Sequence, residues 1–116
     1  MKKEIIAKLG EEIACRYLET KGYKILERNY RYRYFESDII ASINDILVVV
    51  EVKTRKDYKY LYANEAVNYK KQYNLILLTE NYVNQNCLYN HNIRFDVIEC
   101  YWDTKEICHI INAFEA

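Results

Sequence analysis

The stretch Glu36–Lys53 constrains the fold of this chain more than any other segment. Its first arm, residues 36–42, alternates in polarity, and its second arm, residues 47–53, begins as an apolar run rich in β-branched residues. Both patterns predict β-strands. Between the arms, Asn44–Asp45 suits a tight reversal, because both residue types tolerate a positive φ angle. The stretch therefore predicts a β-hairpin.

The register of this hairpin sets two acidic side chains face to face. Counting outward from a two-residue turn, or from a four-residue loop over residues 43–46, places Asp38 opposite Glu51 on one face of the sheet. Carboxylates about 5 Å apart repel by roughly 3 kcal/mol at an effective dielectric constant near 20. An ordinary cross-strand pair contributes only about 0.2–1 kcal/mol. The pair therefore needs a neutralising partner.

Three partners can neutralise the two acids: a bound cation, a shared proton, or Lys53. Lys53 follows Glu51 by two residues and so lies on the same face of the strand. A divalent ion such as Mg²⁺ or Mn²⁺ is the most economical solution, since Mg²⁺ is commonly held by one or two carboxylates together with water and a substrate phosphate. The hairpin therefore predicts a metal site.

Length and composition set the broader limits. The chain has 116 residues, no proline and two glycines, which predicts one domain over residues 1–116. Its formal net charge of zero argues against indiscriminate nucleic-acid binding, although basic residues outnumber acidic ones over residues 16–33 and 53–71. No segment has the length and composition of a membrane span or a signal peptide, and the four cysteines lack metal-binding spacing. These features predict a cytoplasmic protein that makes no membrane contact.

Residues 2–21 have the periodicity of an amphipathic helix. Gly10 falls inside its apolar side, where it permits close approach to a sheet at a cost in helix stability. Glu11 and Glu12 lie at opposite edges of that side, and periodicity does not decide which of them reaches a site. The apolar stripe is predicted to contain Ile6, Leu9, Ile13 and Tyr17, widened by Ile5, Ala14 and Leu18.

A strand is predicted over residues 23–34, and its second half alternates tyrosine with arginine. Arg31 and Arg33, with aromatic rings between them, suit contact with phosphates and stacking on bases. A half-buried strand with its tyrosines inward and its arginines solvated explains the pattern equally well.

The second half of the chain predicts one helix and two strands. A loop over residues 54–61 precedes a helix over residues 69–83, for which Asn68 is a good N-cap. The first turn of that helix carries Lys70 and Lys71, which suits the helix dipole only if they face an anion such as phosphate; otherwise they are a solvated pair. Strands follow at residues 93–102 and 106–111. The core side of the helix is predicted to contain Tyr73, Ile76, Leu77 and Val83.

Two polar residues of the last strands are predicted to have structural rather than catalytic roles. Asp96 lies beside Arg94 and predicts a structural salt bridge, and His109 in an apolar strand predicts a packed side chain. The complete order is then α-β-β-β-α-β-β, an α/β fold with a mixed sheet flanked by helices.

Motifs along the whole chain give it a family resemblance. Asp38 followed after twelve residues by Glu51-x-Lys53 is similar to the PD-(D/E)xK nuclease signature. More closely, the chain resembles the YraN-like bacterial family within that superfamily, which is related to Holliday-junction resolvases. The matching pieces are Gly10-Glu11 with Ala14, Gly22-Tyr23, Asn29, Glu36-x-Asp38-Ile39-Ile40, Val50-Glu51-Val52-Lys53-Thr54-Arg55, Ala66-Val67 with Lys71, Arg94-Phe95-Asp96-Val97-Ile98 and Asn112-Ala113-Phe114.

The resemblance implies a restriction-endonuclease-like αβββαβ core and a metal-dependent nuclease site. Asp38 and Glu51 would hold Mg²⁺ or Mn²⁺ with the carbonyl oxygen of Val52. Lys53 would position or help deprotonate the attacking water and stabilise charge in the transition state. Glu11, the residue that matches the family's Gly-Glu pair, would complete the acidic cluster by holding a second ion or orienting a water.

The resemblance also implies a DNA substrate, branched or structured as for the related resolvases, and a homodimer like theirs. Four basic residues would hold the DNA backbone: Arg31, Arg33, Arg55 and Lys71. The chain departs from the family pattern at Phe35, where the family has glycine, and at Ser37, where it has an aliphatic residue. Two other interpretations remain: a nucleic-acid-binding module that cuts little, and a structural or partner-binding protein in which Glu36–Lys53 and Asp38 are surface ion pairs.

Overall fold

Helices and strands follow one another in the order that the sequence predicts. The computed structural model describes residues 2–55 and 67–116, so the predicted loop from residue 56 onward and the family match at Ala66 lie outside the described residues. The described elements are α1 (Lys3–Thr20), β1 (Lys24–Tyr32), β2 (Phe35–Ile43), β3 (Ile46–Arg55), α2 (Tyr69–Asn86), β4 (Asn92–Tyr101) and β5 (Ile107–Phe114).

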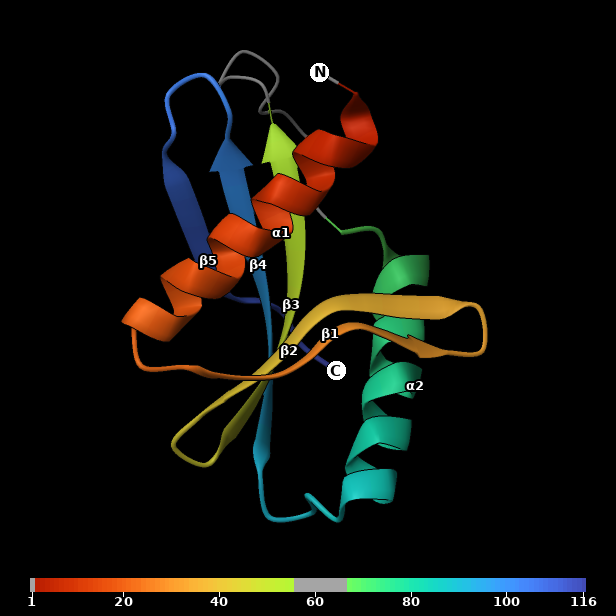
Figure 1. Ribbon diagram of the computed structural model, residues 1–116. Coiled ribbons are helices and arrows are strands. Elements are labelled where there is room, and N and C mark those ends of the chain that lie inside the picture. Colours follow the sequence, from red (N-terminus) through yellow and green to blue (C-terminus); the bar gives the residue numbers. More distant parts are fainter. Residues whose placement is uncertain (1, 56–66) are drawn as a thin grey trace.

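The strands form one mixed sheet in the order β1-β2-β3-β4-β5. All neighbours are antiparallel except β3 and β4, which run parallel on either side of the connection through α2. Figure 1 shows α1 crossing one face of the sheet, while α2 lies on the other side near the β1–β2 hairpin. This is the mixed α/β arrangement, with a restriction-endonuclease-like core, that the sequence predicted. No helix among residues 2–55 and 67–116 is long and apolar enough to cross a membrane.

The central hairpin has the register that the sequence predicts. Ile43 pairs with Ile46, and the pairing continues outward as far as Ile39 and Val50. Asn44 adopts a φ angle of 53°, the left-handed conformation that a tight turn between these strands demands. The same count places Asp38 and Glu51 as the next pair along the two strands.

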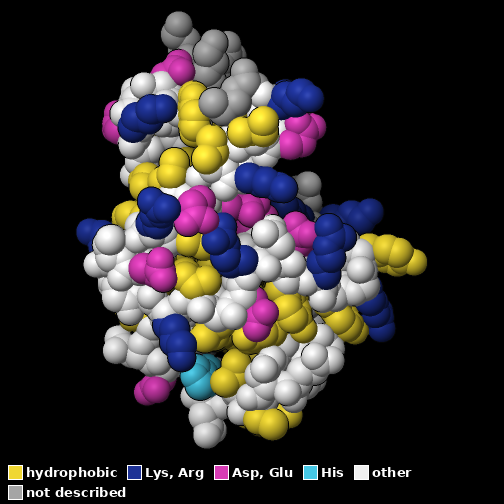
Figure 2. All heavy atoms as spheres, viewed as in Figure 1, with side chains coloured by type: hydrophobic (Ala, Val, Ile, Leu, Met, Phe, Trp, Pro, Cys, Tyr) yellow, Lys and Arg dark blue, Asp and Glu magenta, His cyan; other side chains and the backbone are white. Residues whose placement is uncertain are grey.

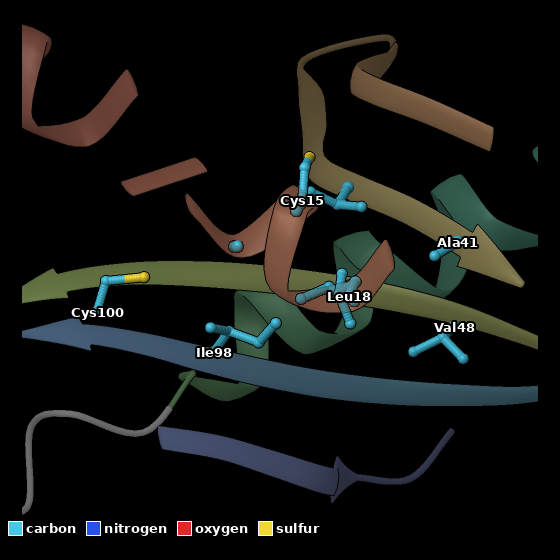
Figure 3. Packing of buried hydrophobic residues seen from close by; sticks show 9 residues of the cluster. Cys15, Leu18, Ala41, Val48, Ile98 and Cys100 are labelled. Atoms are coloured by element: carbon cyan, nitrogen blue, oxygen red, sulfur yellow. The ribbon is translucent and has the colours of Figure 1, made fainter. Parts of the chain in front are cut away.

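The side of α1 that packs on the sheet is rotated from the predicted one toward Gly10, Ala14 and Leu18, which the prediction placed within or at the edge of the apolar stripe. The buried residues of this helix are Gly10, Ala14, Cys15 and Leu18. Figure 3 shows Leu18 among side chains of three strands, Ala41 of β2, Val48 of β3 and Ile98 of β4. The prediction for this stripe was therefore wrong in its centre, because Ile5, Leu9 and Ile13 are exposed along the outer side of the helix.

The second helix is confirmed with a shifted core side. The side chain of Asn68 caps it by accepting a hydrogen bond from the Lys71 backbone N–H at 2.9 Å, as predicted. The helix runs about one turn further than expected, ends at Asn86, and is followed by Cys87 as its C-cap. Its buried residues are Leu75, Leu78, Thr79 and Tyr82, whereas Tyr73, placed in the core by periodicity, is 60% exposed.

The first strand ends earlier than predicted. β1 stops at Tyr32, which pairs with Phe35, and the chain reverses through Arg33 and Tyr34. Arg33 has a φ angle of 57° and its guanidinium carbon lies 5.1 Å from the centre of the Tyr32 ring. The alternation of tyrosine and arginine therefore continues through a tight turn, and Tyr30 and Tyr32 pack inward against the core on the α2 side.

Asp96 has the structural role that its neighbours indicated. Its carboxylate is fully buried and accepts two hydrogen bonds from Arg94, at 2.9 and 2.8 Å. It also contacts the Nε2 atom of His109 at 2.7 Å and accepts from the Asn112 backbone N–H at 3.0 Å. A further contact of 3.1 Å joins the other ring nitrogen of His109 to the Tyr17 hydroxyl. The network thus ties α1, β4 and β5 together.

The close packing of Gly10 gives a first prediction. A Cβ atom added at this position would clash with the Thr54 Oγ1 atom, at only 2.3 Å. We expect Gly10→Ala to lower the free energy of unfolding by about 1–3 kcal/mol, the usual cost of overpacking, although alanine normally stabilises a helix interior. Urea denaturation of Gly10→Ala, Thr54→Ala and the double variant measures the coupling.

In the double variant, removal of the Thr54 hydroxyl makes room for the new methyl group, so most of the lost stability returns. Equal losses from Gly10→Ala in the presence and absence of the Thr54 hydroxyl would contradict this packing argument.

Candidate functional site

The site begins where β2 separates from β3. The regular pairing of the two strands ends at Ile39 and Val50, and one residue further the Asp38 Oδ2 atom accepts a hydrogen bond of 2.8 Å from the Val52 backbone N–H. A side chain thus replaces the backbone partner that β2 would otherwise supply. The carbonyl group of Val52 lies on the same side of β3 as its N–H, because both groups of a strand residue point toward the same neighbour. The opening therefore presents a carboxylate and a backbone oxygen together.

Glu51 is the most deeply buried acid of this site. Its side chain is 2% exposed, and its Oε2 atom forms an ion pair of 2.8 Å with the Nζ atom of Lys71 on α2. The other oxygen, Oε1, is buried and has no hydrogen-bond partner within the described residues. Burial raises the pKa of Glu51 to about 7, and the negative charge of Asp38 adds to the effect. A buried carboxylate oxygen without a partner is costly and calls for an explanation.

The pKa values of Asp38 and Lys71 are raised as well, but for different reasons. Burial raises the pKa of Asp38 above its usual value, although the Val52 amide and the ammonium groups of Lys71 and Lys53 oppose this rise. For Lys71, burial pulls the pKa down, but Glu51 and Asp38 outweigh it and leave the pKa raised. Lys53 also favours the charged form of Glu51. The structure therefore brings both predicted carboxylates close enough to the ammonium groups of Lys53 and Lys71 for all four charges to affect one another.

Glu11 approaches this unit from the opposite layer. Burial and the charge of Asp38 raise its pKa, while a hydrogen bond from Asn29 lowers it. Glu12, by contrast, forms ion pairs with Arg28 at 2.9 Å and Arg16 at 3.3 Å. Of the two glutamates that helical periodicity could not separate, Glu11 is thus the one beside the acidic pair.

The other predicted DNA-binding residues occupy two separate places. Arg31 forms an ion pair of 2.9 Å with Glu36 across the β1–β2 hairpin, and Arg33 lies in the turn at the hairpin tip. Figure 1 shows this tip projecting past α2. Arg55 lies at the end of β3, where its Nε atom is 3.6 Å from the Glu99 carboxylate.

Acidic side chains gather across the middle of the face shown in Figure 2, with Lys and Arg side chains around them and exposed hydrophobic side chains along α1. A neutral chain thus carries an acidic centre bordered by positive charge. Such an arrangement suits a polyanion that approaches with cations already bound or to be bound at the centre.

Asn29 and Glu36 belong to the site although sequence reasoning gave neither of them a role in binding an ion. Asn29 has a φ angle of 52° within β1, and the β1–β2 register places it opposite Asp38. Glu36 contributes negative charge that raises the pKa of Asp38 and Glu11. The signal in the sequence was the match of both residues to the family pattern, together with the tolerance of asparagine for positive φ.

The donor set fits a hard divalent cation. Asp38 and Glu51 supply carboxylates, the Val52 carbonyl supplies a backbone oxygen, and Glu51 Oε1 has a vacant acceptor position. No group of three His, Cys, Asp or Glu side chains in residues 2–55 and 67–116 is already arranged around one point. An ion would therefore be held by two carboxylates and the backbone, with water and a substrate oxygen completing its shell.

The two departures from the family pattern are accommodated by packing. The Phe35 ring lies 6.3 Å from the Tyr32 ring and joins the hydrophobic cluster under α2. Ser37 is fully buried, and its hydroxyl donates a hydrogen bond of 3.2 Å to the Ile39 carbonyl oxygen. Neither side chain replaces an acidic residue of the site.

The sheet order, the two flanking helices and the acidic opening between β2 and β3 define an α/β protein with a restriction-endonuclease-like core. The model of the family described as Uncharacterised protein family UPF0102 matches residues 10–100. The chain belongs to this family, which confirms the YraN-like resemblance.

Relatives in the family match over nearly their whole length. A UPF0102 protein of Clostridioides difficile is 49% identical over 105 residues, covering 90% of this chain and 92% of the relative. One from Alkaliphilus oremlandii is 47% identical, covering 98% of this chain and all of the relative. Another, from Caldanaerobacter subterraneus, is 37% identical, with 97% and 96% covered.

The buried carboxylate gives a prediction for pH. Because the pKa of Glu51 in the folded protein, about 7, exceeds its ordinary value of 4.5, the folded state holds this proton more tightly than the unfolded chain. The free energy of unfolding should therefore fall as pH rises from about 4.5 to about 7, by up to roughly 3 kcal/mol. Asp38 and Glu11 shift in the same direction.

Urea denaturation in EDTA across this range measures the slope. Glu51→Gln should flatten it and make the metal-free protein more stable than wild type near pH 8, while Glu80→Gln, at an exposed position of α2, should leave the slope unchanged. A wild-type stability that rises through this range would contradict the prediction.

Proposed function

We propose that this protein is a metal-dependent endonuclease that hydrolyses phosphodiester bonds in DNA, with branched or structured DNA as its substrate. The observation that carries the proposal is the buried Glu51 carboxylate, which has one oxygen without a hydrogen-bond partner among residues 2–55 and 67–116 and lies beside Asp38 at the opening between two strands. Purely structural acids are seldom left in this state, because burial of an unsatisfied charged group destabilises the fold. A site that binds a cation with its substrate explains the cost.

The proposed cofactor is Mg²⁺ or Mn²⁺, held by Asp38, Glu51 and the Val52 carbonyl. When bound, it supplies a Lewis acid that polarises the phosphate and activates water. Lys53, which projects from the same face of β3 as Glu51, positions the attacking water and stabilises the negative charge that develops on the phosphate oxygens. Glu11, which reaches the cluster from α1, orients water on the other side of Asp38.

Lys71 has two successive roles in this proposal. In the structure its ammonium group neutralises Glu51 at 2.8 Å. When another cation takes over that neutralisation, the ammonium group becomes available to the DNA phosphate at the same place. Arg31 and Arg33 on the hairpin and Arg55 at the end of β3 would hold the flanking backbone.

A second candidate function is a nucleic-acid-binding module with the same fold and little cleavage. The favouring observation is the Lys71–Glu51 ion pair, since it already satisfies part of the acidic centre without a metal. The reading of Glu36–Lys53 and Asp38 as surface ion pairs of a partner-binding protein has less support, because Glu36 pairs with Arg31 and Asp38 accepts a hydrogen bond from the Val52 backbone N–H. We further propose a cytoplasmic location, where DNA is accessible, and a homodimer, by analogy with the related resolvases.

The nuclease proposal predicts a metal-dependent cleavage reaction. Labelled duplex DNA and four-way junctions are incubated with Mg²⁺ or Mn²⁺, and products are separated on denaturing gels. We expect wild type to cut at least one of these structures and Lys53→Ala and Asp38→Asn to be slower by about a hundredfold or more, while Lys70→Ala retains activity.

If wild type and Lys53→Ala are equally inert on every DNA structure, the catalytic part of the proposal fails. Retained junction binding by those inert proteins would then identify the binding module instead.

The ion pair of Lys71 with Glu51 predicts competition with the metal. Removal of the ammonium group by Lys71→Met should tighten Mn²⁺ binding by roughly tenfold or more, since a divalent ion gains twice as much as a proton from the loss of a nearby positive charge. Isothermal titration calorimetry near pH 8 measures the dissociation constant. Lys70→Met is the matched control, because Lys70 is the exposed neighbour in the same helical turn.

Equal Mn²⁺ affinity in wild type and Lys71→Met would show that Lys71 and the metal do not share the Glu51 carboxylate. Absence of Mn²⁺ binding in both proteins would instead remove the metal from the proposal.

A further inference from the structure

A cavity of about 530 Å³ lies between the first turns of α1 and the end of β3. Its apolar lining comes from Ile6 and Ala7 of α1, Val52 of β3 and Trp102, which follows the end of β4. This volume falls in the range of small-molecule pockets. The cavity is therefore large enough for a planar ring system and has an aromatic side chain to receive it.

The cavity adjoins the candidate active site through shared residues. Glu11 lines the cavity, and its pKa is raised by the charge of Asp38. Val52 also lines the cavity, and its backbone N–H donates a hydrogen bond to the Asp38 carboxylate. The cavity and the acidic centre thus have Glu11 and Val52 in common.

Trp102 is held in place in the wall of this cavity. Its backbone N–H donates a hydrogen bond of 2.7 Å to the Arg55 carbonyl oxygen, and the Nζ atom of Lys105 lies 4.0 Å from the centre of the indole ring. Lys3 and Arg55 also line the cavity. A cavity that combines an indole ring with basic side chains matches a nucleotide, whose base stacks on aromatic rings and whose phosphates bind cations.

We propose that this cavity receives one unpaired nucleobase of the bound DNA, stacked against Trp102, next to the phosphate to be cut. The inference rests on the proposed function, since it takes DNA as the substrate, and it adds a basis for choosing among DNA structures. In a continuous duplex every base is paired and stacked, and extrusion of one costs free energy. Branch points, gaps and single-stranded ends supply an unpaired base without that cost, so they bind more tightly.

The chain contains a single tryptophan, so its fluorescence reports on this cavity. The full-length protein in EDTA, which prevents cleavage, is titrated with a short oligothymidylate, with a gapped duplex, and with a continuous duplex of the same sequence. Fluorescence anisotropy of labelled DNA gives the affinities in parallel. We expect saturable quenching of tryptophan emission by the first two DNAs and a much smaller change with the continuous duplex.

Two variants change the cavity, one by removing part of its wall and the other by filling its volume. Trp102→Ala removes the stacking surface, and Ala7→Phe fills the cavity from an exposed helix position while keeping Trp102. Each should weaken binding of the oligothymidylate and the gapped duplex by about ten- to a hundredfold, the usual worth of one stacked base, and leave continuous-duplex binding unchanged. Tyr89→Ala, at an exposed aromatic residue in the loop between α2 and β4, is the matched control. Circular dichroism verifies that each variant is folded. If Trp102→Ala does not fold, Ala7→Phe still tests the cavity.

Several outcomes would overturn the inference. Wild-type affinities in both variants, with unchanged Trp102 emission on DNA binding, would show that DNA binds without using the cavity, and the proposed function would stand. Equal quenching by inorganic phosphate would identify an anion site instead of a base pocket. Failure of every DNA to bind would overturn the proposed function itself, and the inference with it.

Discussion

The hydrogen bond from the Val52 amide to the Asp38 carboxylate is the contact on which the site depends. It replaces the backbone bond that would have continued the β2–β3 pairing, so β2 diverges from β3 without leaving the buried amide unsatisfied. Since the divergence occurs inside the sheet, groups from both helical layers reach it, Glu11 from α1 and Lys71 from α2. A fully paired sheet would have kept those two layers apart.

The charges at this opening are balanced only in part. Asp38 has the Val52 amide and Glu51 has Lys71 on one oxygen, but the other oxygen of Glu51 has no partner in the part of the chain that the structure describes, and the pKa values of both acids are raised. Replacing a partner of a buried charge normally destabilises a protein, and nearby positive charges are the usual compensation. Here the compensation comes from Lys71 of α2, whose side chain is 43% exposed. The structure thus combines a largely buried pair of acids with a counter-charge that is partly open to solvent.

The local chemistry of the hairpin explains why its register could be predicted. Asn44–Asp45 fixes the turn, and alternation fixes which side chains share a face, so the pairing of Ile39 with Val50 follows from the sequence alone. The helices were predicted in place but rotated, because periodicity centred the apolar side of α1 on Leu9 and Ile13, whereas the closest packing is at Gly10 and Ala14, nearer the edge of the predicted stripe. The Lys71–Glu51 contact joins two elements packed by tertiary structure, and no local pattern encodes it.

Gly10 links the acidic centre to the neighbouring cavity. Because its missing side chain lets α1 approach β3 to contact Thr54, the next residue, Glu11, comes within electrostatic reach of Asp38. One turn earlier, Ala7 lies close enough to form a wall of the cavity that Trp102 completes. A larger residue at position 10 would lift this end of the helix, and both the third acid and the cavity wall would move away from the strand together. In the proposed function, the position of Glu11 and the shape of the cavity both depend on this one contact between Gly10 and Thr54, which is a reason for a glycine within a helix that it weakens.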